Sequence, residues 1–202
     1  MNRIITIGRQ FGSGGRELGR RVAQALNMAY YDREVITEIV KRTQLSEAYV
    51  QQVVEHRPNP LYPITIGQSF PLLLDPTWEM NRSIYREQTN VIVEMAQKSD
   101  CVIVGRCADD ILKEHHPLRL FVYAEMEHRL RRTRKHAAPE EQLSDKQLQK
   151  KILDMDRNRA QYYRLYTGKE WGDKENYDLC LNTSGMEIVT LADWVAQLAK
   201  GW

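Results

Sequence analysis

The chain has 202 residues, of which 42% are hydrophobic and 28% are charged, a composition typical of an ordinary globular protein. Because 29 lysines and arginines stand against 27 acidic residues, the net charge of +2 gives no basic field that would argue for nucleic-acid binding. No apolar stretch approaches the roughly 18 residues that span a bilayer, and no signal-peptide pattern precedes the first apolar run. The three cysteines form no Cys-x-x-Cys pair, so we expect reduced thiols and a single cytoplasmic domain over residues 1–202.

The first part of the chain alternates between continuous apolar runs and amphipathic segments. Residues 4–7 predict a strand and residues 16–26 a helix with one apolar face, and residues 29–31 and 34–42 repeat this order. Continuous apolar runs are typical of parallel strands that are covered on both faces. The alternation therefore predicts βαβ units.

Residues 56–79 interrupt this alternation with five prolines and predict a long irregular insertion. Such a segment is either a lid or binding loop, or a packed excursion without a function. A helix over residues 81–98 and strands over residues 101–104 and 118–123 then restore the α/β pattern.

The last third of the chain is mainly helical. We expect helices over residues 126–136, 144–166 and 186–200, a strand over residues 177–181, and a second break over residues 137–144. Residues 126–160 are therefore the candidate lid region. The whole pattern predicts an α/β fold with a doubly wound parallel sheet of about five strands flanked by helices.

A glycine-rich turn joins the first strand to the first helix. Its small residues are Gly12, Ser13, Gly14 and Gly15. They let the backbone turn sharply, so that the first N–H groups of the helix point into the turn and can hold a polyphosphate. Compared with the P-loop pattern Gly-x-x-x-x-Gly-Lys-Ser/Thr, the lysine position holds Gly15 and the hydroxyl position holds Arg16. The nearest cation for the phosphates is Arg16, and Arg9 is the second candidate.

Other interpretations of this turn stay open. A dinucleotide fingerprint starting at Gly12 would require a third glycine where Glu17 stands, although Asp32 lies 20 residues after Gly12, where a ribose-binding acid is expected. The turn could also join the two elements without binding a ligand. Glu17 suits the helix dipole but would repel a phosphate. We assign it to the nucleotide-binding segment, where it either holds the water of a metal ion or pairs with a neighbouring arginine.

Arginines recur on three later elements. Arg106 follows the strand over residues 101–104, at the sheet edge where open α/β sheets bind ligands. Arg129 and Arg132 share one face of a basic helix, and Asp156 and Arg159 share one face of the next. Each of these groups has an alternative interpretation. Arg106 could form a local ion pair, and the basic helix could present a solvated face or bind nucleic acid. Asp156 and Arg159 could form a salt bridge within their helix. No group of residues has metal-ligand spacing.

Taken together, these motifs resemble the cytidylate kinase-like family, a branch of the nucleoside monophosphate kinases. The resemblance runs over nearly the whole chain. It rests on the glycine turn, Tyr-Tyr-Asp at 30–32, Gly-Arg at 105–106, Asp-x-x-Arg at 156–159, and Tyr-Tyr at 162–163 followed by Thr-Gly-Lys-x-Trp-Gly-Asp. It implies a P-loop NTPase-type fold with a helical lid.

The resemblance also implies a reaction, the transfer of the γ-phosphoryl group of ATP to CMP or dCMP with Mg²⁺ between the phosphate oxygens. The residues it assigns to the acceptor are Asp32, Arg106, Asp156 and Arg159. The residues expected to neutralise charge during transfer are Arg16, Arg129, Arg132 and Arg157. We expect small-molecule nucleotides as partners, no nucleic acid and no membrane. A homodimer contact through residues 56–79 stays open.

The chain departs from the family pattern at several functional positions. Besides Gly15 and Arg16, the residues on either side of Gly-Arg are Val104 and Cys107, where the pattern has acids. A rival hypothesis follows, in which the protein is a non-catalytic nucleotide or anion sensor that kept the fold. The retention of arginines on three separate elements favours the kinase.

Overall fold

A five-stranded parallel sheet forms the centre of the computed structural model, which describes residues 2–55, 76–137 and 143–202. Within these residues the strand order is β2-β3-β1-β4-β5. The strands are β1 (Ile4–Arg9), β2 (Ala29–Tyr31), β3 (Cys101–Val104), β4 (Leu118–Tyr123) and β5 (Leu179–Asn182). All of β1 is buried, because it pairs with β3 on one side and with β4 on the other. The predicted α/β sheet is confirmed, and the turn after β1 lies at the middle of its carboxyl edge.

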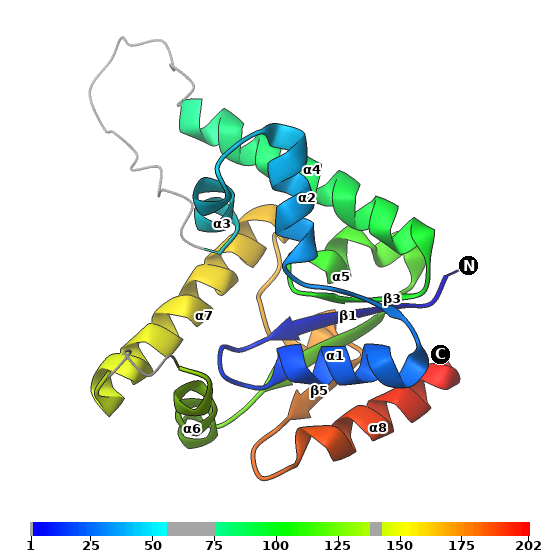
Figure 1. Ribbon diagram of the computed structural model, residues 1–202, viewed down its shortest axis with the longest axis vertical. Coiled ribbons are helices and arrows are strands. Elements are labelled where there is room, and N and C mark those ends of the chain that lie inside the picture. The colour runs from blue at the N-terminus through cyan, green and yellow to red at the C-terminus, as the bar shows by residue number, and fades with distance from the viewer. Residues whose placement is uncertain (1, 56–75, 138–142) are drawn as a thin grey trace.

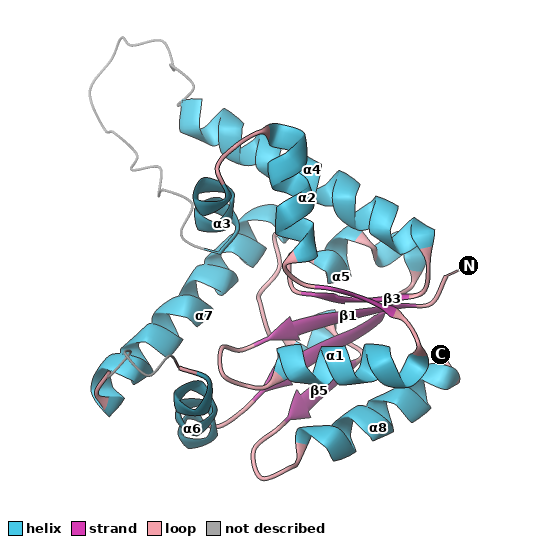
Figure 2. Ribbon diagram, in the orientation of Figure 1, coloured by secondary structure: helices cyan, strands magenta, loops and turns pink. Residues whose placement is uncertain are grey.

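Helices cover both faces of the sheet (Figures 1 and 2). They are α1 (Gly15–Leu26), α2 (Glu34–Thr43), α3 (Glu47–Glu55), α4 (Pro76–Lys98), α5 (Ala108–Ile111), α6 (Met126–His136), α7 (Asp145–Thr167) and α8 (Ile188–Lys200), with 3₁₀ turns η1 (Lys113–His115) and η2 (Lys174–Asn176). Leu18 of α1 and Val195 of α8 pack with Ile5 in one apolar core. Ile36 of α2 and Ile92 of α4 pack with Ile103 in a second core on the opposite face.

Long helices place residues 126–160, the predicted lid region, beside the carboxyl edge of the sheet. Helix α7 begins at a capping box, in which the Gln147 N–H donates to Ser144 Oγ at 3.3 Å and the Ser144 N–H donates to Gln147 Oε1 at 2.9 Å. It then runs past β1, as Figure 1 shows. Within the described ranges, none of the helices combines the length and apolar character that a membrane crossing needs.

Some predicted boundaries differ from the structure. Helix α4 begins at Pro76, five residues before the predicted start at 81, and the rest of the predicted insertion, residues 56–75, lies outside the described residues. Residues 138–142 of the predicted second break also lie outside them. Helix α3 had no predicted counterpart. Ser46 caps its first turn, because the Tyr49 N–H donates to Ser46 Oγ at 3.3 Å.

Candidate functional site

The glycine turn is shaped by left-handed backbone and by close contact with α6. Gly12 has φ +76° and Gly14 has φ +86°, conformations that glycine adopts with little strain. A Cβ on Gly12 would lie 2.8 Å from the Arg129 carbonyl oxygen and 2.8 Å from Thr133 Oγ1. The Ser13 hydroxyl donates to the Gln10 carbonyl at 2.9 Å inside the turn. The turn therefore packs directly on α6, and Gly12 leaves no room for a side chain.

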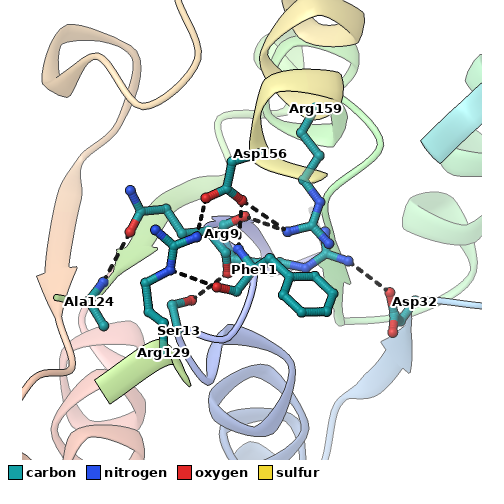
Figure 3. A network of polar contacts seen from close by, with 9 residues as sticks. Arg9, Phe11, Ser13, Asp32, Ala124, Arg129, Asp156 and Arg159 are labelled. Atoms are coloured by element: carbon teal, nitrogen blue, oxygen red, sulfur yellow. Dashed lines mark hydrogen bonds and ion pairs between the residues drawn. The ribbon is translucent and has the colours of Figure 1, made fainter. Parts of the chain in front are cut away.

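Two arginines of α6 hold the main chain of the turn. Arg129 is buried and donates from Nε to the Phe11 carbonyl at 2.7 Å (Figure 3). Arg132 donates from Nη1 to the Ser13 carbonyl at 3.2 Å and from Nη2 to the Thr183 carbonyl at 2.9 Å. Burial lowers the pKa of Arg132. Both predicted lid arginines thus bind the main chain of the glycine turn itself.

Asp156 of α7 fixes the same turn from the other side (Figure 3). Its Oδ1 accepts a 2.7 Å hydrogen bond from the Phe11 N–H, and its Oδ2 accepts one from Arg129. Arg159 Nη1 lies 3.8 Å from Asp156 Oδ1. Burial raises the pKa of Asp156, although these donors oppose the shift. Asp156 therefore joins α6, α7 and the turn into one polar network.

Arg9, the last residue of β1, points its guanidinium group along the carboxyl edge of the sheet. Arg9 Nη2 lies 3.3 Å from Asp32 Oδ1, and Arg16 Nε lies 2.8 Å from Asp32 Oδ2. The two arginines differ in burial, because the Arg9 side chain is 8% exposed and the Arg16 side chain 46%. Burial, together with the like charges of Arg159, Arg16 and Arg106, lowers the pKa of Arg9 to about 9, although the charge of Asp32 opposes the shift. Several cations therefore converge here.

The turn after β3 holds three consecutive residues in left-handed conformations. Gly105, Arg106 and Cys107 have φ values of +76°, +63° and +55°. A non-glycine residue in this region costs on the order of 1–3 kcal/mol, and such strain is concentrated at functional sites. Gln88 stabilises the turn, because its Nε2 donates to the Arg106 carbonyl at 3.0 Å and its Oε1 accepts from the Tyr162 hydroxyl at 3.1 Å.

A pocket opens between these elements, and arginines and aromatic rings line it. Its charged and aromatic lining includes Arg9, Arg106, Arg159, Tyr162, Tyr163 and Trp171. Arg159 donates from Nη1 to the Arg9 carbonyl at 3.1 Å, and its guanidinium carbon lies 5.6 Å from the centre of the Phe11 ring. Asp109 adds an acid to the lining and accepts a hydrogen bond from Tyr163. The arrangement can bind an anionic group beside aromatic side chains.

Two predicted site residues, Arg157 and Glu17, form ion pairs within their own helices instead. Arg157 is 55% exposed and lies 3.0 Å from Asp154 on the same helix. Glu17 forms an ion pair with Arg21 on α1, with Arg21 Nη2 2.8 Å from Glu17 Oε1. Pairing with a neighbouring arginine was one of the two roles expected for Glu17. Trp171, whose role the sequence left undecided, packs edge-on against Phe121 with ring centroids 5.2 Å apart and also lines the pocket.

The residues around the turn fit a polyphosphate better than they fit a bare metal ion. In the part of the chain that the structure describes, no group of three or more histidines, cysteines or acids comes together. The carboxylates beside the turn, Asp32 and Asp156, are engaged by arginines. Mg²⁺ bound with ATP commonly keeps water and substrate phosphates as most of its ligands, which suits this site.

Several residues of the site carried no strong sequence signal. Gln88 was visible only as a polar residue on the apolar stripe of the helix over residues 81–98, and it is fully buried beneath the Arg106 turn. Thr183 follows β5 and donates to the Ser13 carbonyl at 2.6 Å. Neither position belongs to a motif, so only the fold reveals their contacts.

Comparison with known proteins places this site in a kinase fold. The chain resembles the structure of an uncharacterized protein from Eubacterium ventriosum, with 23% identity, 99% of each chain covered and a TM-score of 0.70. It also resembles shikimate kinase from Bacteroides thetaiotaomicron, with 15% identity, 99% of each chain covered and a TM-score of 0.59. For shikimate kinase from Acinetobacter baumannii in complex with shikimate, identity is 19%, coverage is 100% of this chain and 94% of that one, and the TM-score is 0.55. At these identities the likeness shows the fold.

Sequence comparison assigns the family. No curated protein sequence matches the chain. The family model described as the cytidylate kinase-like family matches residues 4–185, which include the glycine turn, the Gly-Arg turn and the arginines of α6 and α7. With that match over most of its length, and with the fold of P-loop kinases, the chain belongs to the cytidylate kinase-like family.

Proposed function

We propose that this protein transfers the γ-phosphoryl group of ATP to a nucleoside monophosphate, CMP or dCMP. The observation that carries the proposal is the convergence of Arg9, Arg106 and Arg159 on one pocket beside the glycine turn. These arginines come from β1, from the turn after β3 and from α7. A scaffold without an anionic ligand has no need to gather buried like charges, because each buried cation loses hydration.

The donor nucleotide is bound by the turn. The N–H groups of residues 12–16 and the positive end of the α1 dipole face the β- and γ-phosphates. Mg²⁺, when bound with the nucleotide, would neutralise part of the charge of the phosphates. Arg129, Arg132 and Asp156 keep the turn in shape through its carbonyl and N–H groups.

The acceptor phosphate is bound by Arg106 and Arg159. Phosphoryl transfer depends mainly on positioning and on charge stabilisation, and guanidinium groups can hold a phosphate in bidentate fashion. Asp32 and Asp156 then serve as the acids that orient the arginines of the site, while Arg106 is set by the Gln88 contact. The reduced cysteines agree with the cytoplasm as the place of this reaction.

A second candidate function is a nucleotide or anion sensor without catalysis. The specific observation in its favour is that Gly15 and Arg16 replace the lysine and the hydroxyl of the P-loop. Both hypotheses predict nucleotide binding, and only the kinase predicts turnover.

The test is ADP release in a coupled assay with ATP, Mg²⁺ and a panel of CMP, dCMP, UMP, AMP and GMP. Arg106→Asn removes the charge with a residue that tolerates left-handed backbone, and Arg159→Met removes the second cation. Arg164→Met is the matched control, because Arg164 lies on the same helix, is 71% exposed and pairs with Glu170.

We expect turnover with a cytidine acceptor, lowered by about 100-fold or more in Arg106→Asn and Arg159→Met and unchanged in Arg164→Met. Turnover with another acceptor alone would correct the substrate. If the protein binds ATP but shows no turnover with any acceptor, the kinase hypothesis is wrong and the sensor hypothesis takes its place.

A further inference from the structure

The two ends of the glycine turn have exchanged their residue types. When the pattern Gly-x-x-x-x-Gly-Lys-Ser/Thr is placed on residues 9–16, Gly14 matches the second glycine. The position of the first glycine then holds Arg9, and the position of the lysine holds Gly15. A cation begins the turn and a glycine stands near its end, in the reverse of the usual order.

The structure shows that these two changes are coupled by packing. A Cβ added to Gly15 would lie 2.7 Å from the Cβ of Arg9 and 3.3 Å from its Cγ. It would also lie 3.3 Å from the Cβ of Val122 on β4. Two such carbons closer than 3.0 Å clash, so the aliphatic stem of Arg9 excludes any side chain at residue 15. The stem of Arg9 occupies the space in which a lysine at this position would begin.

The charged end of Arg9 is equally constrained. A Cβ on Gly105 would lie 2.1 Å from Arg9 Nη1, so the tip of the guanidinium group approaches the main chain after β3 closely and leaves no room for a side chain there. Asp32 binds the same group at 3.3 Å, and Figure 3 shows Arg9 extended toward it. The Arg9 carbonyl is held by Arg159 at 3.1 Å. The cation is thus fixed between the turn and the pocket where donor and acceptor phosphates would meet.

We propose that Arg9 supplies the donor-phosphate charge that the P-loop lysine supplies elsewhere, in place of the more obvious Arg16. This inference rests on the proposed function in that it assumes a nucleoside triphosphate on the turn. Arg16 is the weaker candidate, because its side chain is 46% exposed and pairs with Asp32 through its Nε. Asp32, which contacts both arginines, keeps Arg9 in place until a polyphosphate competes for it.

The test is a reciprocal exchange of the two positions, measured by calorimetric binding of Mg²⁺–ATP and of inorganic tripolyphosphate. Arg9→Met keeps the stem and removes the charge, so it reports on charge with the packing retained. Gly15→Lys adds the missing lysine, and Arg9→Gly with Gly15→Lys restores the usual pattern. Arg16→Met tests the competing cation, and Arg20→Met, an exposed arginine on α1, is the neutral control.

We expect Arg9→Met to weaken the binding of both ligands by about 10- to 100-fold. Arg16→Met should weaken it by at most about threefold, and Arg20→Met should bind both ligands like the parent protein. Gly15→Lys alone is expected to lower the melting temperature because of the contact with the Arg9 stem. The double exchange is expected to recover both the melting temperature and the binding, which gives a strong coupling between the sites.

The proposal is overturned if Arg9→Met binds tripolyphosphate like the parent protein, or if Gly15→Lys has the same effect with arginine and with glycine at position 9. A larger loss in Arg16→Met than in Arg9→Met would assign the role to Arg16 instead. The binding measurements need no acceptor and no turnover. Failure of the kinase assay alone would therefore leave the role of Arg9 intact, whereas parent protein that binds neither ligand would overturn it.

Discussion

Tyr163 of α7 donates a 2.6 Å hydrogen bond to the buried carboxylate of Asp109 at the start of α5. This contact ties the long helix that carries Asp156 and Arg159 to the strained turn that carries Arg106. Burial raises the pKa of Asp109, and the hydrogen bond from Tyr163 opposes the rise. The tyrosine hydroxyl therefore stabilises a carboxylate that the protein interior disfavours.

Tyr163→Phe is predicted to destabilise the fold by about 1–3 kcal/mol at pH 7, because it leaves a buried carboxylate oxygen without its donor. Since the folded-state pKa of Asp109 lies above its unfolded value of 3.8, the carboxyl of the folded protein holds its proton more tightly, and stability falls as pH rises through this window. Loss of the Tyr163 hydroxyl raises that pKa further. The destabilisation should therefore be larger at pH 7 than at pH 4.

Urea unfolding at the two pH values measures this difference. Tyr166→Phe is the matched control on the same helix, because the Tyr166 hydroxyl donates to a neutral group, the Asn81 carbonyl, at 3.3 Å. Its effect should not depend on pH. Equal destabilisation of Tyr163→Phe at pH 4 and pH 7 would show that the charge of Asp109 is not involved.

Arg129→Met is predicted to lower the free energy of unfolding by about 3 kcal/mol, because Asp156 is largely shielded from water and loses its nearest cation. It also removes the hydrogen bond to the Phe11 carbonyl. Arg131→Met on the exposed face of α6 is the control and should change stability by less than about 0.5 kcal/mol. Chemical denaturation separates the two, and an Arg129→Met protein as stable as its parent would leave Arg129 with a role in charge neutralisation only.

Gly12→Ala and Gly168→Ala form a second matched pair. Both glycines have positive φ, +76° and +71°, so both substitutions carry the conformational cost of about 1–2 kcal/mol. A Cβ at Gly168 meets nothing within 4 Å, whereas one at Gly12 lies 2.8 Å from Thr133 Oγ1 and from the Arg129 carbonyl. Gly12→Ala should therefore lower the free energy of unfolding by about 1–3 kcal/mol more than Gly168→Ala does. Equal melting temperatures for the two variants would mean that α6 moves away at no cost.

The strands show how far local pattern determines this fold. The predicted ranges 29–31, 101–104 and 118–123 match β2, β3 and β4. The signal is clearest in β3, where all four residues are buried and apolar. The last strand begins at Leu179, two residues later than predicted. The two residues before it have other roles. The ring centroid of Tyr177 lies 5.0 Å from that of Phe121, and Asp178 pairs with Arg119 of β4.

The site was less accessible to sequence reasoning than the fold. The residue types around the turn could be identified, because glycines and arginines near a strand end indicate phosphate chemistry. Their partners could not, because Arg132 reaches the Ser13 carbonyl only after α6 has packed on the turn. The same holds for Arg9, whose stem excludes a side chain at Gly15 through a contact that no local spacing encodes.

The edge of the sheet is predicted to owe part of its acid stability to Arg119 and Asp178. Arg119 donates to the Asp178 carboxylate from Nε at 3.1 Å, from Nη2 at 2.7 Å and from its main-chain N–H at 2.8 Å. Burial opposes ionisation of Asp178, but these hydrogen bonds outweigh it, and the pKa of Asp178 is lowered. The stabilisation is thus complete above the unfolded-state pKa of 3.8 and is lost as the pH falls through the folded-state value.

Asp178→Asn should accordingly cost about 1–3 kcal/mol at pH 7, and the difference from the parent protein should shrink as the pH approaches 3. Asp154→Asn serves as the control, because its pair with Arg157 is about half exposed and should contribute less than about 1 kcal/mol at any pH. Urea unfolding across pH 3–7 measures both variants. If the Asp178→Asn difference stays constant over this range, the pair stabilises the edge through geometry alone, since a contribution from the ionised carboxylate must disappear when that carboxylate is protonated.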